Sequence, residues 1–545
     1  MKKRILFCGE SSWLSTGFAT YNKEIIRRIY DTDKYIIAEF GSYGNSADES
    51  ALKLPWKFYG NLPKNQQEAQ VYKSQPVNQF GVYKFDAVVA DFQPDIVFDA
   101  RDPWMVEHIL KSQFRANFKT VITPTVDSAP QRKEWIEDTF KKSDIVTTYS
   151  RFGKRILEGQ GVNVTSVTSP GVDLDVFSPK DKFEVRSEWG LQKGLKIIGT
   201  VMRNQKRKCF PELFQAYAKL RKDYGHIKEI KKSVLLCHTS WPDVGWNIPE
   251  LIQRNGLNRH VIFTYRCDAC SRNFFSWFIP SEGKSGNGKC VFCGEIKAHM
   301  PNTHSGVSTE ELSEIFNMMD IYVQPAICEG WALPIVEAKA CGVPGLYSNY
   351  SAMEDHVENG GGIAIDIGTF YTEAETMAVR SLPDVDSMVA GFKDLLTNSK
   401  KRKKMGKRAR ECALTLHNWD STANEFERIF DELDMHDRSK TWNRRPEFKI
   451  VNNIALPAGL NNEQFVLACY RNILHREPDK QGFTNWMNSL ASGNSRESVE
   501  AFFRGENQTH NKFETIRWNK SLEVRGYDPN KALSIESIGL PGVLV

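Results

Sequence analysis

Two carboxylates, Glu329 and Glu337, are separated by seven residues in a segment whose other side chains are mostly apolar, residues 320–344. The apolar run 321–323 predicts a buried parallel strand, and Pro334 predicts the first turn of the helix that follows. Glu329 is therefore expected in the loop at the carboxyl end of a strand, with Glu337 one turn into the next helix. Open α/β sheets bind ligands at that edge, where helix N-termini attract phosphate.

The surroundings of Glu337 distinguish it from an ordinary surface acid. Charged side chains usually face water, so two exposed carboxylates at this spacing are the alternative interpretation. Glu337 instead has apolar neighbours in sequence, Ile335, Val336, Ala338 and Ala340. A carboxylate in such surroundings needs hydrogen-bond partners, and sugar hydroxyls would supply them.

The segment EGWALPIVE, with the flanking EAKACGVP, resembles the E-x7-E signature of retaining GT-B glycosyltransferases. The resemblance implies that Glu329 faces the donor sugar and that Glu337 binds the ribose hydroxyls of the nucleotide. It also implies that Gly330, Trp331 and Leu333, which lie between the two acids, belong to the donor site.

A basic run, RNQKRK at 203–208, stands between a predicted strand over 196–201 and a predicted helix over 211–222. Cations at such a junction favour a polyphosphate site, and exposed basic residues without a ligand are the alternative. The GT-B family places an arginine and a lysine five residues apart on the donor phosphates, and Arg203 and Lys208 match that spacing. The resemblance therefore implies that both assist departure of the diphosphate.

Two further candidates follow predicted strands in the amino-terminal half. The loop 10–17 leads into a helix expected over 18–30 and suits a phosphate or sugar, or else it is an ordinary βα turn. By resemblance, Gly17 matches the family loop that reaches the donor diphosphate. Asp127 follows the predicted strand 120–122, where many family members carry a histidine that contacts the donor sugar, and a structural cap is the alternative. Asp127 is thus a catalytic candidate.

Four cysteines form the pattern C-x2-C-x19-C-x2-C, namely Cys267, Cys270, Cys290 and Cys293. Thiolates on two such knuckles are the arrangement that a tetrahedral structural zinc requires, and free thiols or a redox pair are the alternatives. Because four ligands complete the coordination shell, this zinc is expected to be structural, and no catalytic metal is expected.

The composition indicates a multidomain soluble protein. The 545 residues are 41% hydrophobic and include 13 Trp and 32 Phe, enough for several large cores. We expect no membrane span, because no apolar run reaches eighteen residues, and the first residues predict a β-strand in place of a signal peptide. An odd number of cysteines, 11, favours a reducing compartment, the cytoplasm of a bacterium or of a phage-infected host. The net charge of +5 permits a polyanionic partner without requiring one.

These features predict an α/β protein of the GT-B class with two Rossmann-like domains that face a cleft. The predicted parts are an acceptor domain over 1–178, a nucleotide-sugar domain over 179–416, a zinc-ribbon-like insertion over 265–297, a crossover helix over 417–437 and a helical module over 458–545. The Pro and Gly content of 169–179 supports the first boundary. The sequence at 470–486 resembles phycobilisome linker repeats, which implies docking or oligomerisation.

By resemblance, the function is transfer of a sugar, with retention, from a UDP- or GDP-sugar to a hydroxyl acceptor. A glycan or lipid-linked glycan is the preferred acceptor. The alternative is DNA carrying hydroxymethylated pyrimidines, as in phage-type enzymes, which the zinc ribbon and eight basic residues within 400–410 favour. As a solvated helix face, that basic cluster needs no function. A non-catalytic GT-B-like binding protein is the third hypothesis.

Overall fold

The computed structural model describes residues 2–192, 194–281, 287–302, 305–442, 456, 459–473, 478 and 480–504. The chain divides into two compact units, one of residues 1–124, 134–147 and 423–545, the other of residues 125–133 and 148–422. The predicted acceptor domain over 1–178 thus spans parts of both units.

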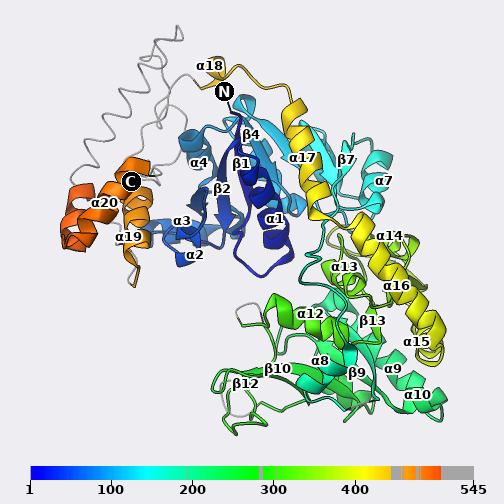
Figure 1. Ribbon diagram of the computed structural model, residues 1–545. Coiled ribbons are helices and arrows are strands. Elements are labelled where there is room, and N and C mark those ends of the chain that lie inside the picture. The colour runs from blue at the N-terminus through cyan, green and yellow to red at the C-terminus, as the bar shows by residue number, and fades with distance from the viewer. Residues whose placement is uncertain are drawn as a thin grey trace. The chain divides into compact units, whose positions relative to one another are not determined.

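The first sheet is parallel, with the strand order β3-β2-β1-β4-β5-β6-β7 (Figure 1). Its strands are β1 Arg4–Glu10, β2 Ile36–Ser42, β3 Lys57–Gly60, β4 Ile96–Asp99, β5 Lys119–Ile122, β6 Ile145–Thr148 and β7 Ser166–Val167. The helices of this part of the chain are α1 Gly17–Asp31, α2 Glu49–Leu52, α3 Gln66–Ser74, α4 Phe85–Phe92, α5 Pro103–Leu110, α6 Lys133–Trp135 and α7 Arg151–Gly159. β2 and β3 are not among the strands predicted from the sequence, and β3 lies within residues 41–83, which are rich in polar and aromatic residues.

The second sheet has the order β11-β10-β9-β8-β13-β14-β15, with β12 paired to β10. Its strands are β8 Lys196–Val201, β9 Ser233–His238, β10 Val261–Cys267, β11 Asn273–Trp277, β12 Ala298–His299, β13 Ile321–Gln324, β14 Gly345–Ser348 and β15 Gly362–Ile365. The helices of this unit are α8 Lys182–Glu188, α9 Phe210–Tyr224, α10 Lys228–Lys231, α11 Ile248–Arg254, α12 Thr309–Met318, α13 Leu333–Ala340, α14 Met353–Glu358, α15 Val385–Thr397 and α16 Ser399–Leu416.

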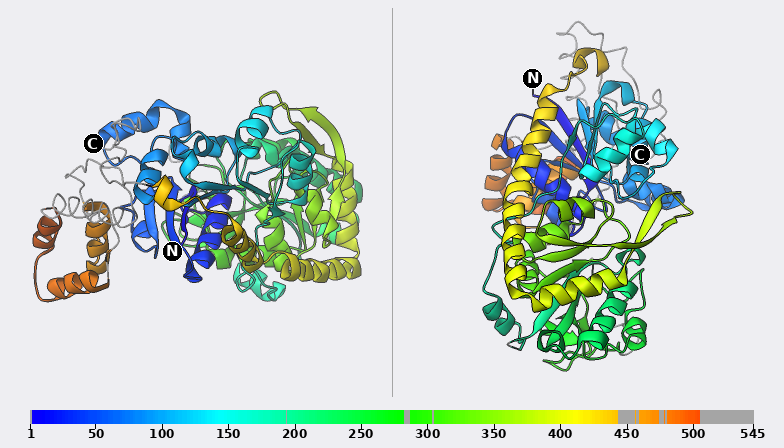
Figure 2. Two further views of the ribbon diagram at one scale, coloured as in Figure 1. Left: turned by 90° about the horizontal axis from the view of Figure 1, so that it is seen from above. Right: turned by 90° about the vertical axis from the view of Figure 1, so that its right-hand side faces the viewer.

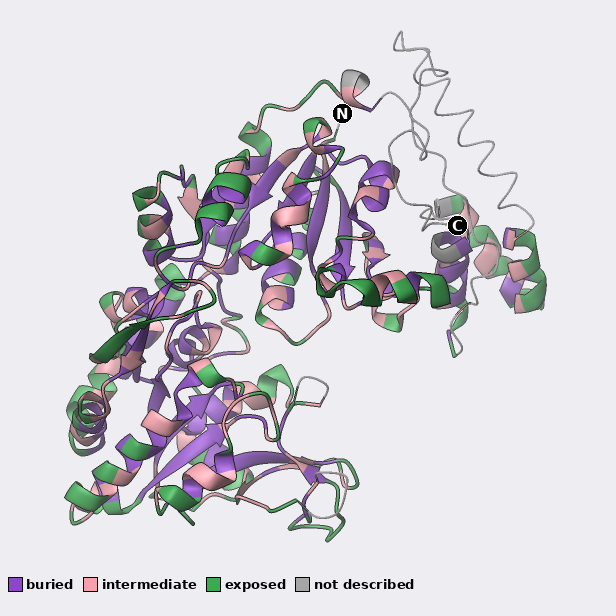
Figure 3. Ribbon diagram, turned by 180° about the vertical axis from the view of Figure 1, so that it is seen from behind, coloured by how far each residue is buried: buried purple, intermediate pink, exposed green. Residues whose placement is uncertain are grey.

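Both central sheets are buried, as Figure 3 shows in purple, because parallel strands carry helices on both faces. β13 is buried at all four positions, and α13 behind it buries Ile335, Val336 and Ala338. This packing fixes the direction of the loop between β13 and α13, which carries Glu329.

A two-stranded antiparallel hairpin of β16 Ile367–Thr372 and β17 Val379–Pro383 follows the second sheet. It is the yellow-green pair of arrows in the right-hand view of Figure 2. β16 is largely exposed, whereas β17 buries Arg380 and Ser381. This hairpin was not predicted from the sequence.

The cysteine-rich insertion extends the second sheet. β10 runs on to Cys267 and pairs antiparallel with β11 and with β12. Phe274 is buried there and stacks on Tyr265 with ring centroids 5.7 Å apart, while Trp277 is 40% exposed. The insertion is therefore part of the sheet and of its hydrophobic core, which includes Cys267 and Cys290.

The carboxy-terminal helices are α17 Trp419–Glu432, α18 Arg438–Thr441, α19 Asn462–Ala468 and α20 Lys480–Ala491. Phe426 and Phe430 of α17 contact Phe98 in the first unit. The polar segment between the predicted crossover helix and the predicted module, residues 438–457, begins with helix α18, and Trp442 is buried in the first unit's core. Most of residues 443–458 and all of residues 505–545 lie outside the described residues. Within the described part of the chain, no helix combines the length and hydropathy needed to span a membrane.

Candidate active site

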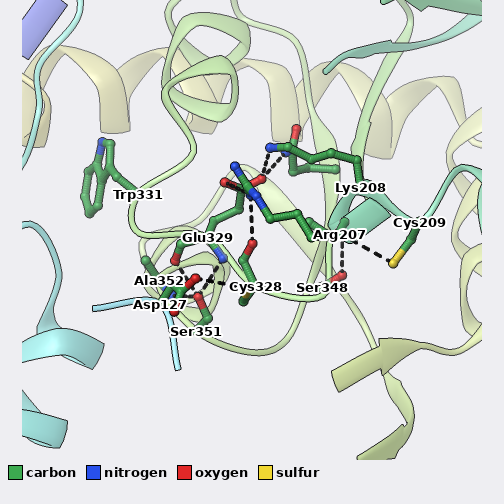
Figure 4. Close-up of polar contacts among 12 residues, drawn as sticks. Asp127, Arg207, Lys208, Cys209, Cys328, Glu329, Trp331, Ser348, Ser351 and Ala352 are labelled. Atoms are coloured by element: carbon green, nitrogen blue, oxygen red, sulfur yellow. Dashed lines mark hydrogen bonds and ion pairs between the residues drawn. The ribbon is translucent and has the colours of Figure 1, made fainter. Parts of the chain in front are cut away.

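Glu329 lies in the loop between β13 and α13, and its buried carboxylate is surrounded by donors (Figure 4). Arg207 Nη1 donates to Oε2 over 2.7 Å, and Lys208 Nζ forms an ion pair with Oε1. Gln324 Nε2 donates to the same Oε1 over 2.9 Å. The main chain is fixed as well, because Ser351 Oγ accepts from Glu329 N over 2.9 Å and donates to Glu329 O.

The charges of this cluster determine its protonation. Burial alone would raise the pKa of Glu329, but Arg207 and Lys208 outweigh burial and lower it to about 2. Burial and the charge of Arg207 lower the pKa of Lys208 to about 8, although Glu329 opposes this shift. At neutral pH, Glu329 is thus a carboxylate fixed between two cations.

Glu337 differs from Glu329 in having no polar partner. It lies one turn into α13, partly accessible to solvent, and among the described residues its carboxylate makes neither a hydrogen bond nor an ion pair. Burial raises the pKa of Glu337 to about 7. A carboxylate in this setting can accept hydrogen bonds from a ligand that reaches the start of α13.

The entry to α13 has a tightly constrained backbone. A Cβ on Gly330 would lie 2.3 Å from Thr125 Cγ2, so a larger residue there would require Thr125 to move. Ala332, the N-cap residue, has a φ of 69°, in the left-handed region that non-glycine residues rarely adopt. Strain of this kind persists only where the surrounding packing enforces it, often at functional sites. Leu333 is the first residue of the helix, and Pro334 follows it without a free N–H.

Trp331 is directed away from the Glu329 carboxylate, as Figure 4 shows. Its indole packs against the rings of His356 and His417, with centroids 4.5 and 5.5 Å away. The carbonyl of Trp331 contacts His356 Nε2 at 2.7 Å. The structure therefore does not bring this predicted donor-site ring next to Glu329, because the tryptophan fills the core behind the loop.

Asp127, the catalytic candidate predicted after strand 120–122, lies beside the loop between β13 and α13. Arg380 Nη1 donates to Asp127 Oδ1 over 2.9 Å and to Cys328 Sγ over 3.0 Å, and Cys328 Sγ donates to Asp127 Oδ2 over 3.2 Å. Arg380 also pairs with Glu373 over 2.8 Å. Arg380 of the β16–β17 hairpin thus neutralises Asp127 and also contacts Cys328, the residue that precedes Glu329 in the chain.

Of the other two predicted phosphate-site residues, Arg203 has a carboxylate partner of its own and Gly17 belongs to the first unit. Arg203 is half-exposed and pairs with Asp243, with Nε–Oδ2 at 2.9 Å and Nη2–Oδ1 at 3.0 Å, while Lys208 contacts Glu329. Gly17 is the first residue of α1 in the first unit, and Thr16 caps that helix by accepting from Ala19 N.

Sequence reasoning did not identify several residues that hold the site. Arg207 belongs to the basic run at 203–208, but the five-residue spacing of the family predicted Arg203 and Lys208 in its place. Nothing in the sequence marked Arg380, whose position depends on a hairpin inserted after the second sheet. Gln324, Cys328 and Ser351 carried no motif.

The four predicted metal ligands lie together. Their sulfur atoms are within 4.8 Å of one another, with Cys267–Cys293 at 3.6 Å and Cys270–Cys290 at 3.9 Å. Tetrahedral zinc with Zn–S bonds of about 2.3 Å separates its sulfurs by roughly 3.8 Å. The four thiols therefore fit such an ion with little rearrangement.

The basic segment 400–410 forms part of α16 and is not uniformly solvated. Arg402 Nη1 donates to Leu396 O over 3.1 Å, and Arg410 Nη1 donates to Phe177 O over 2.8 Å and to Ala340 O over 2.7 Å. Lys401 also pairs with Asp394 over 2.6 Å and Arg408 with Glu411 over 3.8 Å, so four of the eight cations have partners among the described residues. The exposed lysines that face one side of the helix are Lys400, Lys403, Lys404 and Lys407.

Comparison with known proteins finds two family matches. Residues 297–412 match the family described as glycosyl transferases group 1, and residues 453–511 match a domain of unknown function, DUF4214. A curated relative, the MMP α-(1→4)-mannosyltransferase of Mycolicibacterium hassiacum, is 28% identical over 131 residues, which are 24% of this chain and 29% of that protein. The chain thus aligns with less than a third of this relative's length.

Solved structures confirm the predicted GT-B fold. Sucrose-phosphate synthase from Thermosynechococcus elongatus superposes with a TM-score of 0.56 at 15% identity, covering 79% of this chain and 99% of that one. Anabaena HepE in complex with UDP and glucose gives 0.55 at 13% identity, covering 79% and 100%. A trehalose-6-phosphate synthase described in terms of glycosyl transfer with retention gives 0.52 at 13% identity, covering 80% and 100%.

Proposed function

We propose that this protein is a retaining glycosyltransferase that moves a sugar from a nucleotide-diphosphate donor to a hydroxyl acceptor. The observation that carries the proposal is the pair of unlike acids at the carboxyl end of β13. Glu329 is held by Arg207 and Lys208, whereas Glu337 is unpaired among the described residues and close to the start of α13. The match of residues 297–412 to glycosyl transferases group 1 supports it.

Each group has a role that follows from its chemistry. The Glu337 carboxylate, which has no donor among the described residues, accepts hydrogen bonds from vicinal hydroxyls such as those of a ribose. Lys208 and Arg207 provide positive charge beside the donor sugar and its diphosphate, so they stabilise negative charge that grows on the leaving group. Arg203 would join them on the phosphates if the donor displaced it from Asp243.

Glu329 and Asp127 lie on the sugar side in this scheme. Because Glu329 stays ionised between two cations, it can accept hydrogen bonds from sugar hydroxyls and stabilise positive charge that develops at the anomeric carbon. Asp127 is held by Arg380 and Cys328 next to that loop. No metal is needed for these steps, since side chains supply the positive charge.

A UDP-sugar is the proposed donor, supported by solved relatives of the same fold that carry UDP. A glycan or lipid-linked glycan is the preferred acceptor. DNA remains the second candidate acceptor, because the exposed lysines on one side of α16, Lys400, Lys403, Lys404 and Lys407, could contact a phosphate backbone. A cytoplasmic location is proposed from the odd number of cysteines, 11, which favours a reducing compartment.

The Cys267, Cys270, Cys290 and Cys293 cluster is proposed to hold one structural zinc. Zinc bound there would fix the end of β10 to the loop that precedes β12, and its closed shell leaves no position for a substrate. The carboxy-terminal module is proposed to serve docking or oligomerisation, and its matched family has no assigned function.

The decisive experiment measures UDP binding and the slow hydrolysis of UDP-sugars by the purified chain. Glu337→Gln should weaken UDP binding, and Glu329→Gln should abolish hydrolysis with UDP still bound. Glu310→Gln, an exposed acid at the start of α12, is the matched control. If no nucleotide sugar binds or is hydrolysed, the non-catalytic hypothesis replaces this one.

A further inference from the structure

The second cysteine knuckle carries an exposed apolar loop. Within residues 289–297, Val291, Phe292 and Ile296 are 60%, 57% and 43% exposed. Apolar side chains of this size are usually exposed singly, so three within six positions on one short loop form a local patch that water solvates poorly.

The loop is held rigidly despite its exposure. Cys290 is buried, and its backbone N–H donates to Glu295 O over 2.8 Å while Gly294 N donates to Cys290 O over 3.0 Å. Phe292 also lies edge-on to the buried Phe274 ring, with centroids 5.4 Å apart. The apolar side chains are therefore presented outward on a fixed backbone, and docking them would cost little conformational entropy.

Cations flank the patch. Lys289 and Lys297 are exposed at the two ends of the loop, and the exposed Arg272 lies over the Phe292 ring at 5.2 Å. None of these three cations forms an ion pair with a carboxylate in the described part of the chain. The acids nearby are Glu295, which is exposed, and Asp268, which contacts His299 at 3.1 Å. The loop surface thus combines apolar side chains with three exposed cations, while a zinc ion held by the four thiolates would add a formal charge of −2 at the same knuckle.

We infer that this loop docks the protein on an anionic lipid surface. Phe292, Val291 and Ile296 would enter the boundary between headgroups and acyl chains, and the flanking cations would contact lipid phosphates. A nucleic acid fits less well, because two of the three apolar side chains are aliphatic and offer no stacking face to a base. The area of three side chains is also far smaller than the roughly 800 Å² that each partner buries in a stable protein–protein interface.

The inference goes beyond the proposed transfer reaction, since it assigns a location and a surface that catalysis does not require. It would bring the second unit to a membrane on which a lipid-linked acceptor is displayed. The vesicle measurements below do not depend on sugar transfer, so they can fail while the proposed function holds, and the reverse.

The test is co-flotation of the full-length protein with vesicles of equimolar phosphatidylcholine and phosphatidylglycerol, compared with vesicles of phosphatidylcholine alone. Wild-type protein should bind the anionic vesicles. Val291→Ser with Phe292→Ser should weaken binding at least tenfold. Lys289→Glu with Lys297→Glu should weaken it by more than about 25-fold, since each lysine near an anionic surface contributes roughly fivefold.

Matched controls separate docking from general surface effects. Val244→Ser removes a side chain that is 68% exposed outside the loop and should leave binding unchanged. Unchanged zinc content and unfolding temperature would show that the loop variants are folded. A Phe292→Trp variant should lose fluorescence when brominated lipids are used, which reports insertion directly.

The inference is overturned if wild-type protein does not float with anionic vesicles, or if the loop variants float as well as wild type. It is also overturned if binding is lost on Lys403→Glu with Lys404→Glu in α16 and retained in the loop variants, because α16 would then be the docking surface.

Discussion

Glu329, in the loop that links β13 to α13, and Glu337, within α13, have pKa values shifted in opposite directions. Two cations lower the pKa of Glu329 to about 2, and burial without a partner raises that of Glu337 to about 7. Two acids so close in sequence and so different in protonation are suited to different tasks. Glu329 supplies a permanent negative charge, and Glu337 is available to a ligand.

The pKa of Glu337 predicts how nucleotide binding depends on pH. UDP affinity should fall as pH drops through about 7, because the protonated acid loses most of its accepting capacity. Isothermal titration at several pH values checks this. Glu337→Gln should bind weakly at all of them and show no step. A step that persists in the variant would assign the titration to another group.

The same shift predicts a gain in stability. A folded-state pKa of about 7 lies above the unfolded value of about 4.3, so ionised Glu337 destabilises the fold once the pH exceeds the unfolded value. Glu337→Gln should therefore raise the free energy of unfolding by about 1–2 kcal/mol above pH 7 and by almost nothing near pH 4. Urea unfolding at both pH values measures it, and equal effects at the two values would contradict the assignment.

Arg207 is predicted to contribute as much to the rate of sugar transfer as Arg203 and Lys208, the two residues that match the family spacing. Arg207→Ala removes donors to the Glu329 carboxylate and to Cys328 O, the latter over 3.1 Å. We expect kcat/KM to fall by roughly tenfold to hundredfold, which corresponds to one lost charge-assisted hydrogen bond. The control is Lys206→Ala, an exposed neighbour. Equal activity in the two variants would remove Arg207 from the site.

Much of the fold was predictable because buried parallel strands are continuous apolar runs bounded by turn residues. The segment 320–344 shows this most clearly: β13 spans Ile321–Gln324, and α13 spans Leu333–Ala340. β2 was missed because it is followed by polar, aromatic sequence, and its pairing with β1 is a tertiary feature. The contacts of Arg380 were not predictable for a similar reason, since they join residues 127, 328 and 380, which are distant in the chain.

Arg380, in the β16–β17 hairpin, is predicted to position the loop that bears Glu329. Arg380→Ala would leave Asp127 and Glu373 without their cation and release the Cys328 thiol, so the loop that bears Glu329 should loosen. We expect kcat to fall by about tenfold or more with little change in UDP affinity, because Glu337 lies in α13, away from these contacts. Arg380→Lys should recover part of the rate. A matching loss of UDP affinity in Arg380→Ala would indicate general unfolding of the site.

Metal analysis should find one zinc ion per chain. Cys267→Ser should abolish zinc binding and lower the unfolding temperature of the insertion, because metal binding and local folding are coupled. Cys8→Ser, which alters a buried cysteine of β1, is the control and should retain the zinc. Protein purified without chelators that contains no zinc would exclude the metal site.

Charge reversal at the exposed lysines of α16 tests whether the acceptor is DNA or a glycan. If DNA is the acceptor, its affinity should fall steeply with salt, because each neutralised phosphate contributes about 0.9 to the slope of log K against log salt concentration. Charge reversal at Lys403, Lys404 and Lys407 should then flatten that slope by about three such contacts. Arg402 and Arg410 should be left unchanged, since their structural contacts would confound the result.

Filter binding with duplex DNA, together with sugar transfer to hydroxymethylated DNA, measures both effects. If duplex DNA does not bind at low salt and its modified bases receive no sugar, the glycan remains as the acceptor, and α16 is a solvated helix whose lysines serve only to keep the surface charged.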